Sequence, residues 1–300
     1  MTPDAFDRLK PALACPRCKG DLDFAPTRAR CEDCDRDYPI GDGQIRFVDA
    51  PPPADDLDSL KHRLKKLLGA SYYTLFRPLL SPSYPFSFAR FVRRNLDAGA
   101  IAVDLGSGNV RRLPGLYTLD RMPYAEVDIV CDMRLLPFRP GGVDAFVSNV
   151  VLEHVPEIDR VVAEITRATR TGGRGIHVIP FLYPFHASPD DFQRYTHMGA
   201  RGLFPGWRVA AQFPASGPFT LFNAMTAEVV SILLGFGRDR LRSLVYLGTA
   251  ALLAPLKFLD VAFVGRRAFL SVAPSILTVL DKPDGPAGQA SQERPGAEST

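Results

Sequence analysis

The sequence lacks a long apolar run at its N-terminus, and no later stretch stays apolar over the length of a membrane span. The first residues, MTPDAFDRLKPALAC, have no extended apolar core of the kind found in secretory signals. The longest strongly apolar run is Ser243–Pro255, and the uncharged window Val209–Ala227 is broken by Pro214, Gly217 and Pro218. Because a spanning helix needs about 20 apolar residues, we expect a cytoplasmic protein, with at most a peripheral contact at the inner face of the membrane.

A large excess of charge of one sign is also missing. The formal net charge is +3 over 300 residues, so the chain as a whole does not have the strongly basic character of a nucleic-acid-binding protein. The exception is Lys61–Arg94, which has eight Lys or Arg and no Asp or Glu. Any affinity for phosphates or acidic lipids is expected there, and a solvated basic helix face is the alternative.

Cysteine is scarce, but its spacing is informative. Four of the five cysteines, Cys15, Cys18, Cys31 and Cys34, form the pattern C-x2-C-x12-C-x2-C. Two such turns place four thiolates at tetrahedral reach of one Zn²⁺ with no open position for a substrate, so we expect a structural zinc site. Two disulfides are the alternative, which the lack of a secretory signal disfavours. Cys131 is expected to be a small core residue.

Residues 1–50 are expected to form a small unit of their own. So short a chain builds little core, and the metal is expected to supply its folding energy. The segment CPRCKGDLDF…CEDCDRDYPIGDGQIRFVD resembles the Trm112-like zinc ribbons that precede or partner methyltransferases. Pro51–Asp58 is typical of a linker. Residues 51–83 are expected to hold this linker and a basic amphipathic helix, with Leu60 and Leu64 on one face.

From residue 101 the chain alternates short apolar runs with turns. Strands are predicted at Ile101–Leu105, Leu116–Asp120, Val127–Asp132, Val143–Asn149, Gly175–Phe181 and Ser275–Pro283. The spacing of Ile158, Val161, Val162, Ile165 and Ala168 predicts an amphipathic helix that ends before the TGG sequence at 171–173. Continuous apolar strands are typical of a parallel sheet covered on both faces, so we expect an α/β fold with a Rossmann-like, mostly parallel sheet.

Polar motifs follow these strands at their carboxyl ends, where ligands of parallel sheets bind. Gly106 and Gly108 in VDLGSGN allow a sharp turn and a close backbone approach to a ligand, although a lone GxG is a weak signal. Asp120 ends the second strand and could accept ribose hydroxyls. Asp132 ends the third strand, where an adenine amino group could bind. A nicotinamide-dinucleotide site is the alternative, but only about seven residues separate Gly108 from the second strand, too few for its long helix.

The ordered series of motifs, with VLEHV after the fourth strand, resembles class I S-adenosylmethionine-dependent methyltransferases over about residues 100–205. The resemblance implies S-adenosylmethionine as the cofactor. It implies that Asp104, Gly106 and Gly108 line its methionine and ribose side, that Asp120 takes the ribose hydroxyls, that Asp132 and the Met133 backbone meet the adenine, and that Asn149 lies near the methyl donor. The first crossover is shorter than in the family, so we expect an irregular turn in which Asn109 stands where a third glycine is usual.

A polar segment, FHASPDDFQRYT (Phe185–Thr196), follows the fifth strand. An alcohol that attacks a methyl group must lose its proton, and a histidine or carboxylate within hydrogen-bond reach can take it. His186 and Asp190 are the candidate catalytic residues, with Arg194 steadying Asp190 or an anionic group of the substrate. A helix that begins at Ser188 is the competing explanation for the aspartates.

Three interpretations of the function stay open. The segment PFLYPFHASPDDFQRYT resembles a block in bacterial methyltransferases of polysaccharide and glycolipid biosynthesis, which implies O-methylation of a sugar, a glycolipid or a similar small polar acceptor. A ribosomal-RNA base methyltransferase with the zinc ribbon as its RNA-binding module is the alternative, although no Asn-Pro-Pro-aromatic motif follows the fourth strand. A non-catalytic binding scaffold is the third, against which the intact Asp104 and Asp120 argue.

Two histidines and the C-terminal third complete the expectations. His177 is expected to pack inside its strand, and His154 is expected to cap a helix or to lie at the edge of the cofactor. Residues 221–268 are expected to be a helical insertion in a methyltransferase domain of residues 84–283. This insertion caps one sheet face or, with its flanking arginines, lies on a bilayer surface. Residues 284–300 are typical of a disordered tail.

Overall fold

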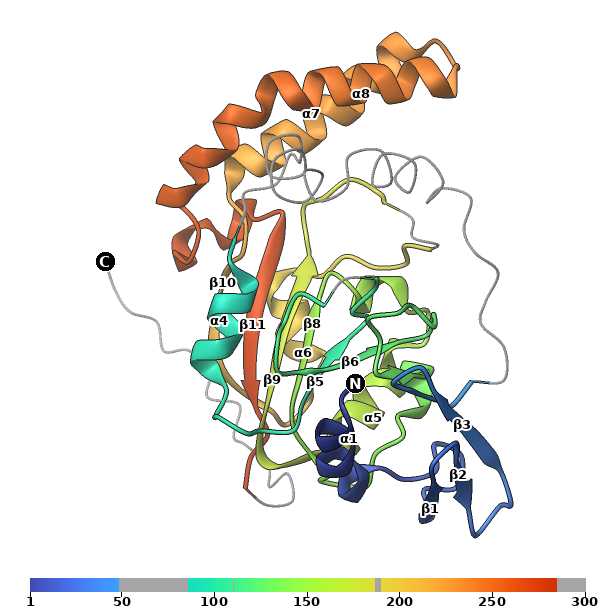
Figure 1. Ribbon diagram of the computed structural model, residues 1–300. Coiled ribbons are helices and arrows are strands. Elements are labelled where there is room, and N and C mark those ends of the chain that lie inside the picture. Colours follow the sequence, from blue (N-terminus) through green and yellow to red (C-terminus); the bar gives the residue numbers. More distant parts are fainter. Residues whose placement is uncertain (49–85, 110, 187–189, 285–300) are drawn as a thin grey trace, which may run out of the picture.

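The computed structural model describes residues 1–48, 86–109, 111–186 and 190–284 (Figure 1). The linker and the basic helix expected within residues 51–83 lie outside the described residues, as does nearly all of the expected tail. Ser188, the expected first residue of a helix, lies outside them as well.

Among the described residues, eleven strands form one sheet in the order β1-β2-β3-β4-β7-β6-β5-β8-β9-β11-β10. Neighbours from β4 to β9 in this order run parallel, whereas β1 to β4 form antiparallel pairs and β11 is antiparallel to both of its neighbours. The strands are β1 (Leu22–Ala25), β2 (Arg28–Cys31), β3 (Asp37–Gly41), β4 (Gln44–Arg46), β5 (Ala102–Leu105), β6 (Tyr117–Asp120), β7 (Ile129–Val130), β8 (Val143–Asn149), β9 (Thr169–Pro180), β10 (Arg208–Pro214) and β11 (Ser275–Asp281). The expected α/β fold with a parallel core is confirmed.

Helices cover both faces of this sheet (Figure 1). On one face Phe88 and Val92 of α4 pack against Val147 of β8 and Leu277 of β11. On the other face Val161 and its neighbours in α5 join a larger core. The helical elements are α1 (Pro3–Leu9), η1 (Lys10–Ala12), α4 (Phe88–Asn95), η3 (Met133–Leu135), η4 (Leu152–His154), α5 (Ile158–Ala168), α6 (His197–Gly202), α7 (Pro218–Gly235), α8 (Asp239–Leu253), η5 (Ala254–Ala262) and η6 (Arg267–Val272).

The N-terminal segment extends the sheet instead of standing apart from it. Strand β4 pairs in parallel with β7, so that Ile45 lies beside Ile129 and the Phe47 N–H donates to the Val130 carbonyl at 2.8 Å. Leu13 bridges to Phe138, and the core that contains α5 also contains residues of the N-terminal segment. Shared core and shared sheet hydrogen bonds therefore stabilise the first residues in addition to any metal.

One strand was missed from the sequence. Strand β10 lies within a window that we interpreted as interrupted by prolines, and its alternating burial includes a bulge between Val209 and Ala211. Edge strands tolerate such bulges and a terminal proline, because one side of the strand needs no partner. The predicted helix Ile158–Ala168 and the predicted strand Val143–Asn149 are confirmed at both ends.

The apolar C-terminal helices are longer than the sequence suggested. Pro218–Gly235 and Asp239–Ala262 are long and apolar enough, by length and composition, to cross a membrane, and 33% and 22% of their most apolar windows are buried. Our expectation that no stretch reaches the length of a membrane span was therefore wrong, although the window Val209–Ala227 is interrupted as expected, since β10 ends at Pro214 and α7 begins at Pro218. Pro218 occupies the first turn of α7, where its missing N–H costs nothing, and Pro255 occupies the first turn of η5. Figure 1 shows α7 and α8 side by side as a hairpin.

Candidate active site

The turn after β5 is built for close approach of a ligand. Gly106 and Gly108 adopt the left-handed region, with φ of 61° and 68°, where a side chain would be strained. A Cβ on Gly106 would lie 2.4 Å from Val151 Cγ1, whereas a Cβ on Gly108 would meet nothing within 4 Å. Ser107 Oγ between them is buried without a hydrogen-bond partner among the described residues. The open side of Gly108 and this orphan hydroxyl fit a polar ligand in the turn. As expected, no helix occurs among the described residues between β5 and β6.

Asp104, in β5, has an unusual electrostatic environment. Its side chain is almost completely buried. Burial raises the pKa of Asp104 to about 7, an effect that the positive charge of Arg112 reduces and the negative charge of Asp120 increases. The arginine therefore compensates the buried carboxylate only in part, and a cationic group of a ligand would supply further positive charge.

Asp120, at the end of β6, holds the glycine turn in place. Its Oδ2 accepts the N–H of Gly108 at 2.8 Å, and its Oδ1 accepts the N–H of Met122 at 2.9 Å. Burial raises the pKa of Asp120, and these backbone donors lower it in part. A carboxylate has about four lone-pair sites, so each oxygen can still accept one hydroxyl.

Asp132 and Met133 follow β7, which β6 separates from β5 in the sheet. Asp132 caps η3 by accepting the Arg134 N–H at 2.9 Å, and it forms an ion pair with the Arg134 guanidinium, which also pairs with Glu157. Burial raises the pKa of Asp132, but the Arg134 contacts outweigh burial and lower it. The side chain thus has a structural partner already.

A cleft of about 220 Å³ opens between these elements. It is lined by Phe88, Asp104, Gly106, Ser107, Arg112, Leu113 and Asn149. Asp104, Gly106 and Asn149 were expected there from the sequence. The other expected cofactor residues, Gly108, Asp120, Asp132 and Met133, do not line it. Phe88, from α4, and Arg112 were missed because no motif marks them, and only the tertiary fold brings them to the cleft.

Backbone strain follows β8 directly beside the cleft. Val150 has φ of 58°, in the left-handed region that a β-branched residue strongly disfavours. Its N–H donates to the Val178 carbonyl of β9 at 2.9 Å, which holds it in place. Such strain costs about 1–3 kcal/mol and commonly occurs at functional sites.

The polar segment after β9 is held by one arginine. The Arg194 guanidinium binds both carboxylate oxygens of Asp191, and it also donates to the carbonyls of Tyr183 at 3.2 Å and Pro184 at 3.0 Å. Our expectation that Arg194 steadies Asp190 was wrong, since Asp190 is exposed and its neighbour is 1% exposed. Of these two neighbouring residues in an irregular loop, only Asp191 contacts Arg194.

The Asp191 carboxylate joins two parts of this loop through hydrogen bonds. Its Oδ2 also accepts the His186 N–H at 2.8 Å. Burial raises the pKa of Asp191, but the Arg194 hydrogen bonds and the His186 N–H outweigh burial and lower it to about 2. No helix begins at these aspartates among the described residues, because α6 starts only at His197 with Thr196 as its N-cap. The helix-start explanation for the aspartates was therefore wrong.

The loop brings His186 to a buried acid that the sequence analysis missed. His186 Nε2 lies 3.7 Å from Glu153 Oε1, and His154 Nε2 lies 3.6 Å from the same oxygen. Glu153 is 0% exposed, and the His154 and His186 rings meet edge to face at 5.2 Å. The available signal was the Glu-His pair within VLEHV, since charged or polar residues in an otherwise apolar motif face either solvent or a site.

His177, as expected, is a packed residue. It is 0% exposed, its ring stacks on Phe204 at 4.9 Å, and its Nδ1 lies 2.9 Å from Ser148 Oγ. Burial lowers the pKa of His177 to about 3, so the ring is neutral near pH 7.

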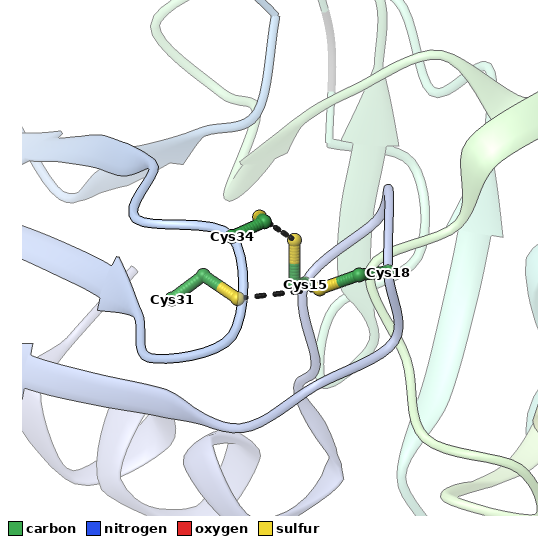
Figure 2. Close-up of side chains that lie close together, drawn as sticks. All are labelled: Cys15, Cys18, Cys31 and Cys34. Atoms are coloured by element: carbon green, nitrogen blue, oxygen red, sulfur yellow. Dashed lines mark hydrogen bonds between the residues drawn. The ribbon is translucent and has the colours of Figure 1, made fainter.

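The four cysteines of the N-terminal segment converge, as Figure 2 shows. Cys15 Sγ lies 3.6 Å from Cys34 Sγ, and Cys18 Sγ lies 3.3 Å from Cys31 Sγ, so the thiols are free and not joined as disulfides. Burial raises the pKa of Cys15, but backbone N–H groups and the Tyr38 hydroxyl at 3.1 Å outweigh burial and hold it at about 6. This environment favours a thiolate, the form that binds metals.

The chain matches known proteins in the part that carries the cleft. A family model described as a methyltransferase domain matches residues 87–176. The tRNA (carboxymethyluridine(34)-5-O)-methyltransferase ALKBH8 of Macaca fascicularis is 29% identical over 173 residues, which cover 51% of this chain and 26% of that protein. The chain thus spans about a quarter of the length of this curated relative.

Solved structures with a similar arrangement are distant in sequence. One is the complex between the Haloferax volcanii Trm112 methyltransferase activator and a protein assigned as a methyltransferase, with 19% identity, a TM-score of 0.42, and coverage of 77% of this chain and 100% of that chain. Another is the Haemonchus contortus phosphoethanolamine N-methyltransferase 2 with S-adenosyl-L-methionine, with 13% identity, a TM-score of 0.42, and coverage of 73% and 60%.

The matched residues 87–176 contain the glycine turn and Asn149, which line the cleft, and VLEHV, whose Val151 adjoins Gly106. This agreement of motif order, sheet topology and family match identifies residues 87–176 as a methyltransferase domain, which a four-cysteine cluster precedes in the chain.

Proposed function

We propose that the enzyme methylates a hydroxyl oxygen of a sugar, a glycolipid or a similar small polar acceptor. The observation that carries this proposal is the loop after β9, which Arg194 and Asp191 hold so that His186 faces Glu153 at the carboxyl edge of the sheet. A hydroxyl nucleophile must lose a proton, and an imidazole beside a carboxylate can accept it. Asp190 is exposed at the same loop and is left as a contact for the acceptor.

S-adenosylmethionine supplies an electrophilic methyl group on a sulfonium. We propose that Asp104 faces the positive charge of this cofactor, that the Gly106–Gly108 turn cradles it, and that Asp120 accepts ribose hydroxyls. The fit is supported by the only partly compensated burial of Asp104, by the open side of Gly108 and by the free lone pairs of Asp120. Asn149 is proposed near the methyl donor, and Asp132 and Met133 at the adenine.

The four-cysteine cluster is proposed to hold one structural Zn²⁺. Tetrahedral Zn–S bonds of about 2.3 Å separate sulfur atoms by about 3.8 Å, close to the 3.3 and 3.6 Å between the sulfurs of the two pairs. All four ligand atoms lie within 4.8 Å of one another. Four protein ligands leave no open position, which supports a structural role.

The α7–α8 hairpin supports a lipid-linked acceptor. Large apolar side chains are exposed along it and its extension, among them Leu233 (66%), Phe236 (76%), Leu244 (68%), Leu252 (78%) and Val261 (67%). Figure 1 shows the hairpin beyond the end of the sheet to which the β9 arrowhead points. In α8, burial and the neighbouring Tyr183 raise the pKa of Tyr246 to about 12. Tyr183 itself packs on His186 at 5.3 Å, so the hairpin adjoins the proposed acceptor loop.

We propose that this hairpin lies on the cytoplasmic face of a bilayer without crossing it. Its tip carries Arg238, Asp239 and Arg240, and moving such charges through the hydrocarbon is costly. Arginines at the tip fit the phosphate level of an anionic leaflet, with the apolar side chains below it.

Vesicle binding tests the membrane part of the proposal. Vesicles of phosphatidylcholine and phosphatidylglycerol should sediment with the protein, and the double variant Leu233→Glu/Phe236→Glu should weaken binding by at least about tenfold, because each buried apolar side chain contributes about 1.5–3 kcal/mol. Leu135→Glu is the matched control, since Leu135 is 47% exposed but lies in η3. Equal binding by all three proteins, or none by the wild type, would contradict the membrane role.

An RNA acceptor is the second candidate, and it has one observation in its favour. The relative from Macaca fascicularis is named as a tRNA methyltransferase. The basic stretch that could follow phosphates, Lys61–Arg94, lies mostly outside the described residues.

Methyl transfer to cell fractions separates the two acceptors. Purified enzyme is incubated with methyl-labelled S-adenosylmethionine and either total RNA or an organic-solvent extract of membranes. We expect label in the extract that survives ribonuclease and disappears with His186→Ala. Label that ribonuclease removes would contradict the proposal and favour RNA.

A further inference from the structure

The buried side chain of Glu153 has no donor to neutralise it. It is 0% exposed, and neither of its carboxylate oxygens has a hydrogen-bond partner among the described residues. A buried carboxylate without a partner costs several kcal/mol, so proteins keep one only beside a cation or where function requires it. The fixed backbone of η4 holds Glu153 in place, and the Phe192 N–H donates to its carbonyl at 2.9 Å.

His154 presents the lone pair of its Nε2 to the Glu153 carboxylate. His154 Nδ1 lies 2.5 Å from the Asp190 carbonyl, which can only accept, so Nδ1 carries the proton. The unprotonated Nε2 then points toward Glu153 Oε1 at 3.6 Å.

His186 is oriented in the same way. Its Nδ1 lies 3.3 Å from the Pro184 carbonyl and 3.5 Å from Asp191 Oδ2, and both of these are acceptors. Arg194 Nη2 is also 3.2 Å away, but its two protons are directed to those same two acceptors, at 3.0 and 2.5 Å. Nδ1 of His186 is therefore the donor. Its Nε2, which is buried and has no hydrogen-bond partner among the described residues, carries a lone pair.

With the ring protons assigned in this way and Glu153 ionised, three acceptor atoms converge on one point. The ligand atoms of Glu153, His154 and His186 all lie within 4.8 Å of one another. Bonds of about 2.0–2.1 Å to a tetrahedral metal separate ligand atoms by about 3.4 Å, and the two contacts to Glu153 Oε1 are 3.6 and 3.7 Å. Coordination also requires the ring nitrogens of His154 and His186, which lie within 4.8 Å of each other, to approach this separation.

We propose that Glu153, His154 and His186 bind a divalent first-row metal ion. Two imidazoles and one carboxylate are a ligand set used by catalytic Zn²⁺ and Fe²⁺ sites, which keep further positions open. The Asp190 carbonyl and the Pro184–Asp191 pair orient the two rings from behind, as the outer partners of metal-binding histidines do.

The cluster adjoins the cleft and the proposed acceptor loop. Glu153 is in the turn directly after Val151, whose side chain adjoins Gly106, and His186 is in the acceptor loop. With the cation bound, His186 would be a ligand in place of the base, and a hydroxyl of the acceptor bound to the cation would lose its proton to water at lower pH than a free alcohol, because the cation stabilises the alkoxide. This role rests on the proposed function, whereas binding of the cation does not.

Titration with Mn²⁺, followed by the electron paramagnetic resonance of the free ion, tests the site. Mn²⁺ is a suitable probe because thiolates select softer metals, so the four cysteines retain zinc. Full-length protein with its zinc content measured should bind one equivalent of Mn²⁺. Glu153→Gln and His186→Ala should each weaken binding at least tenfold. His197→Ala is the matched control and should bind as the wild type, since His197 lies outside the cluster.

S-adenosylmethionine binding, measured by calorimetry on the same samples, separates the outcomes. Mn²⁺ binding that depends on Glu153 and His186 supports the metal site even if no methyl transfer is found. Cofactor binding without saturable Mn²⁺ binding in the wild type would overturn it and leave the cluster as a proton-binding base. Equal Mn²⁺ affinity in Glu153→Gln, with its melting temperature intact, would also overturn it.

Discussion

The described residues contain two clusters of side chains that could hold a metal ion, and the clusters differ in almost every respect. The four cysteines come from one short segment, Cys15–Cys34, and offer four ligand atoms. The second cluster joins the Glu153–His154 pair of η4 to His186, more than thirty residues later in the chain, and provides only three ligands. A closed site contributes stability, whereas an open site can bind a substrate.

The two clusters also differ in the hydrogen bonds that their surroundings provide. Cys15 receives hydrogen bonds from Tyr38 and from backbone N–H groups, so the sulfur is stabilised before any metal binds. Glu153 receives none among the described residues. The first cluster is therefore part of the fold, and the second is held in place at a cost by the rest of the fold.

The largest expected effect is the loss of the cysteine cluster. Cys15→Ser should destabilise the protein by about 3–5 kcal/mol, because a structural metal is lost and β1–β4 continue the main sheet. Thermal denaturation should show a melting temperature lower by about 10 °C. Cys131→Ala is the control, since this buried cysteine lies outside the cluster and should cost only about 1 kcal/mol. Equal decreases in melting temperature for Cys15→Ser and Cys131→Ala would contradict a stabilising role of the cysteine cluster.

The Glu153→Gln substitution should stabilise the protein, in contrast to Cys15→Ser. In metal-free protein the free energy of unfolding should rise by about 1–3 kcal/mol, because a buried unpaired charge is removed at constant shape. Urea denaturation after chelation measures it. Asp191→Asn is the contrast: it leaves Arg194 without its partner and should destabilise the protein. A destabilised Glu153→Gln protein would indicate that Glu153 is structural, like the cysteines.

The cleft provides a third buried carboxylate for this comparison. The pKa of Asp104 is raised to about 7 in the fold, so its contribution to stability is fully present below about pH 4 and is lost as the pH rises to 7. Asp104→Asn should remove this loss. Without cofactor, the melting temperature of the wild type relative to Asp104→Asn should fall between pH 4 and pH 8. A constant difference would contradict the only partly compensated burial of Asp104.

The smallest expected effect concerns the strained residue beside the cleft. Val150→Asn should raise the free energy of unfolding by about 1 kcal/mol, because asparagine tolerates the left-handed region better than a β-branched residue. Val209→Asn, at a half-buried strand position, should lower it. Denaturation of both variants measures the difference. Destabilisation by both would show that packing outweighs strain at Val150.

Much of the fold followed from local patterns. Continuous apolar runs predicted β5, β6 and β8 within a residue, since each run is short, buried and bounded by turns. The helix Ile158–Ala168 followed from its apolar spacing. Strand β10 and the full lengths of α7 and α8 did not, because their boundaries depend on edge pairing and on prolines in first turns, which are harmless there.

The candidate site was predictable only in part. Gly106, Asp104 and Asn149 follow strands whose parallel order brings them to one cleft. Phe88 and Arg112 reach it from elements without a motif, and the partner of Arg194 depends on which aspartate the loop buries. Side-chain direction in an irregular loop has no sequence period, so the choice between Asp190 and Asp191 could not be made in advance.

The sequence by itself determined the cysteine cluster, the parallel core and the order of the cofactor motifs, because each depends on spacings within a few tens of residues. The tertiary structure alone decided that the N-terminal strands continue the main sheet and that His186 meets Glu153. The physical reason is the same in both cases. Contacts between distant segments are chosen by burial and hydrogen bonding across the whole fold, and in this protein they bring one buried acid and two histidines together.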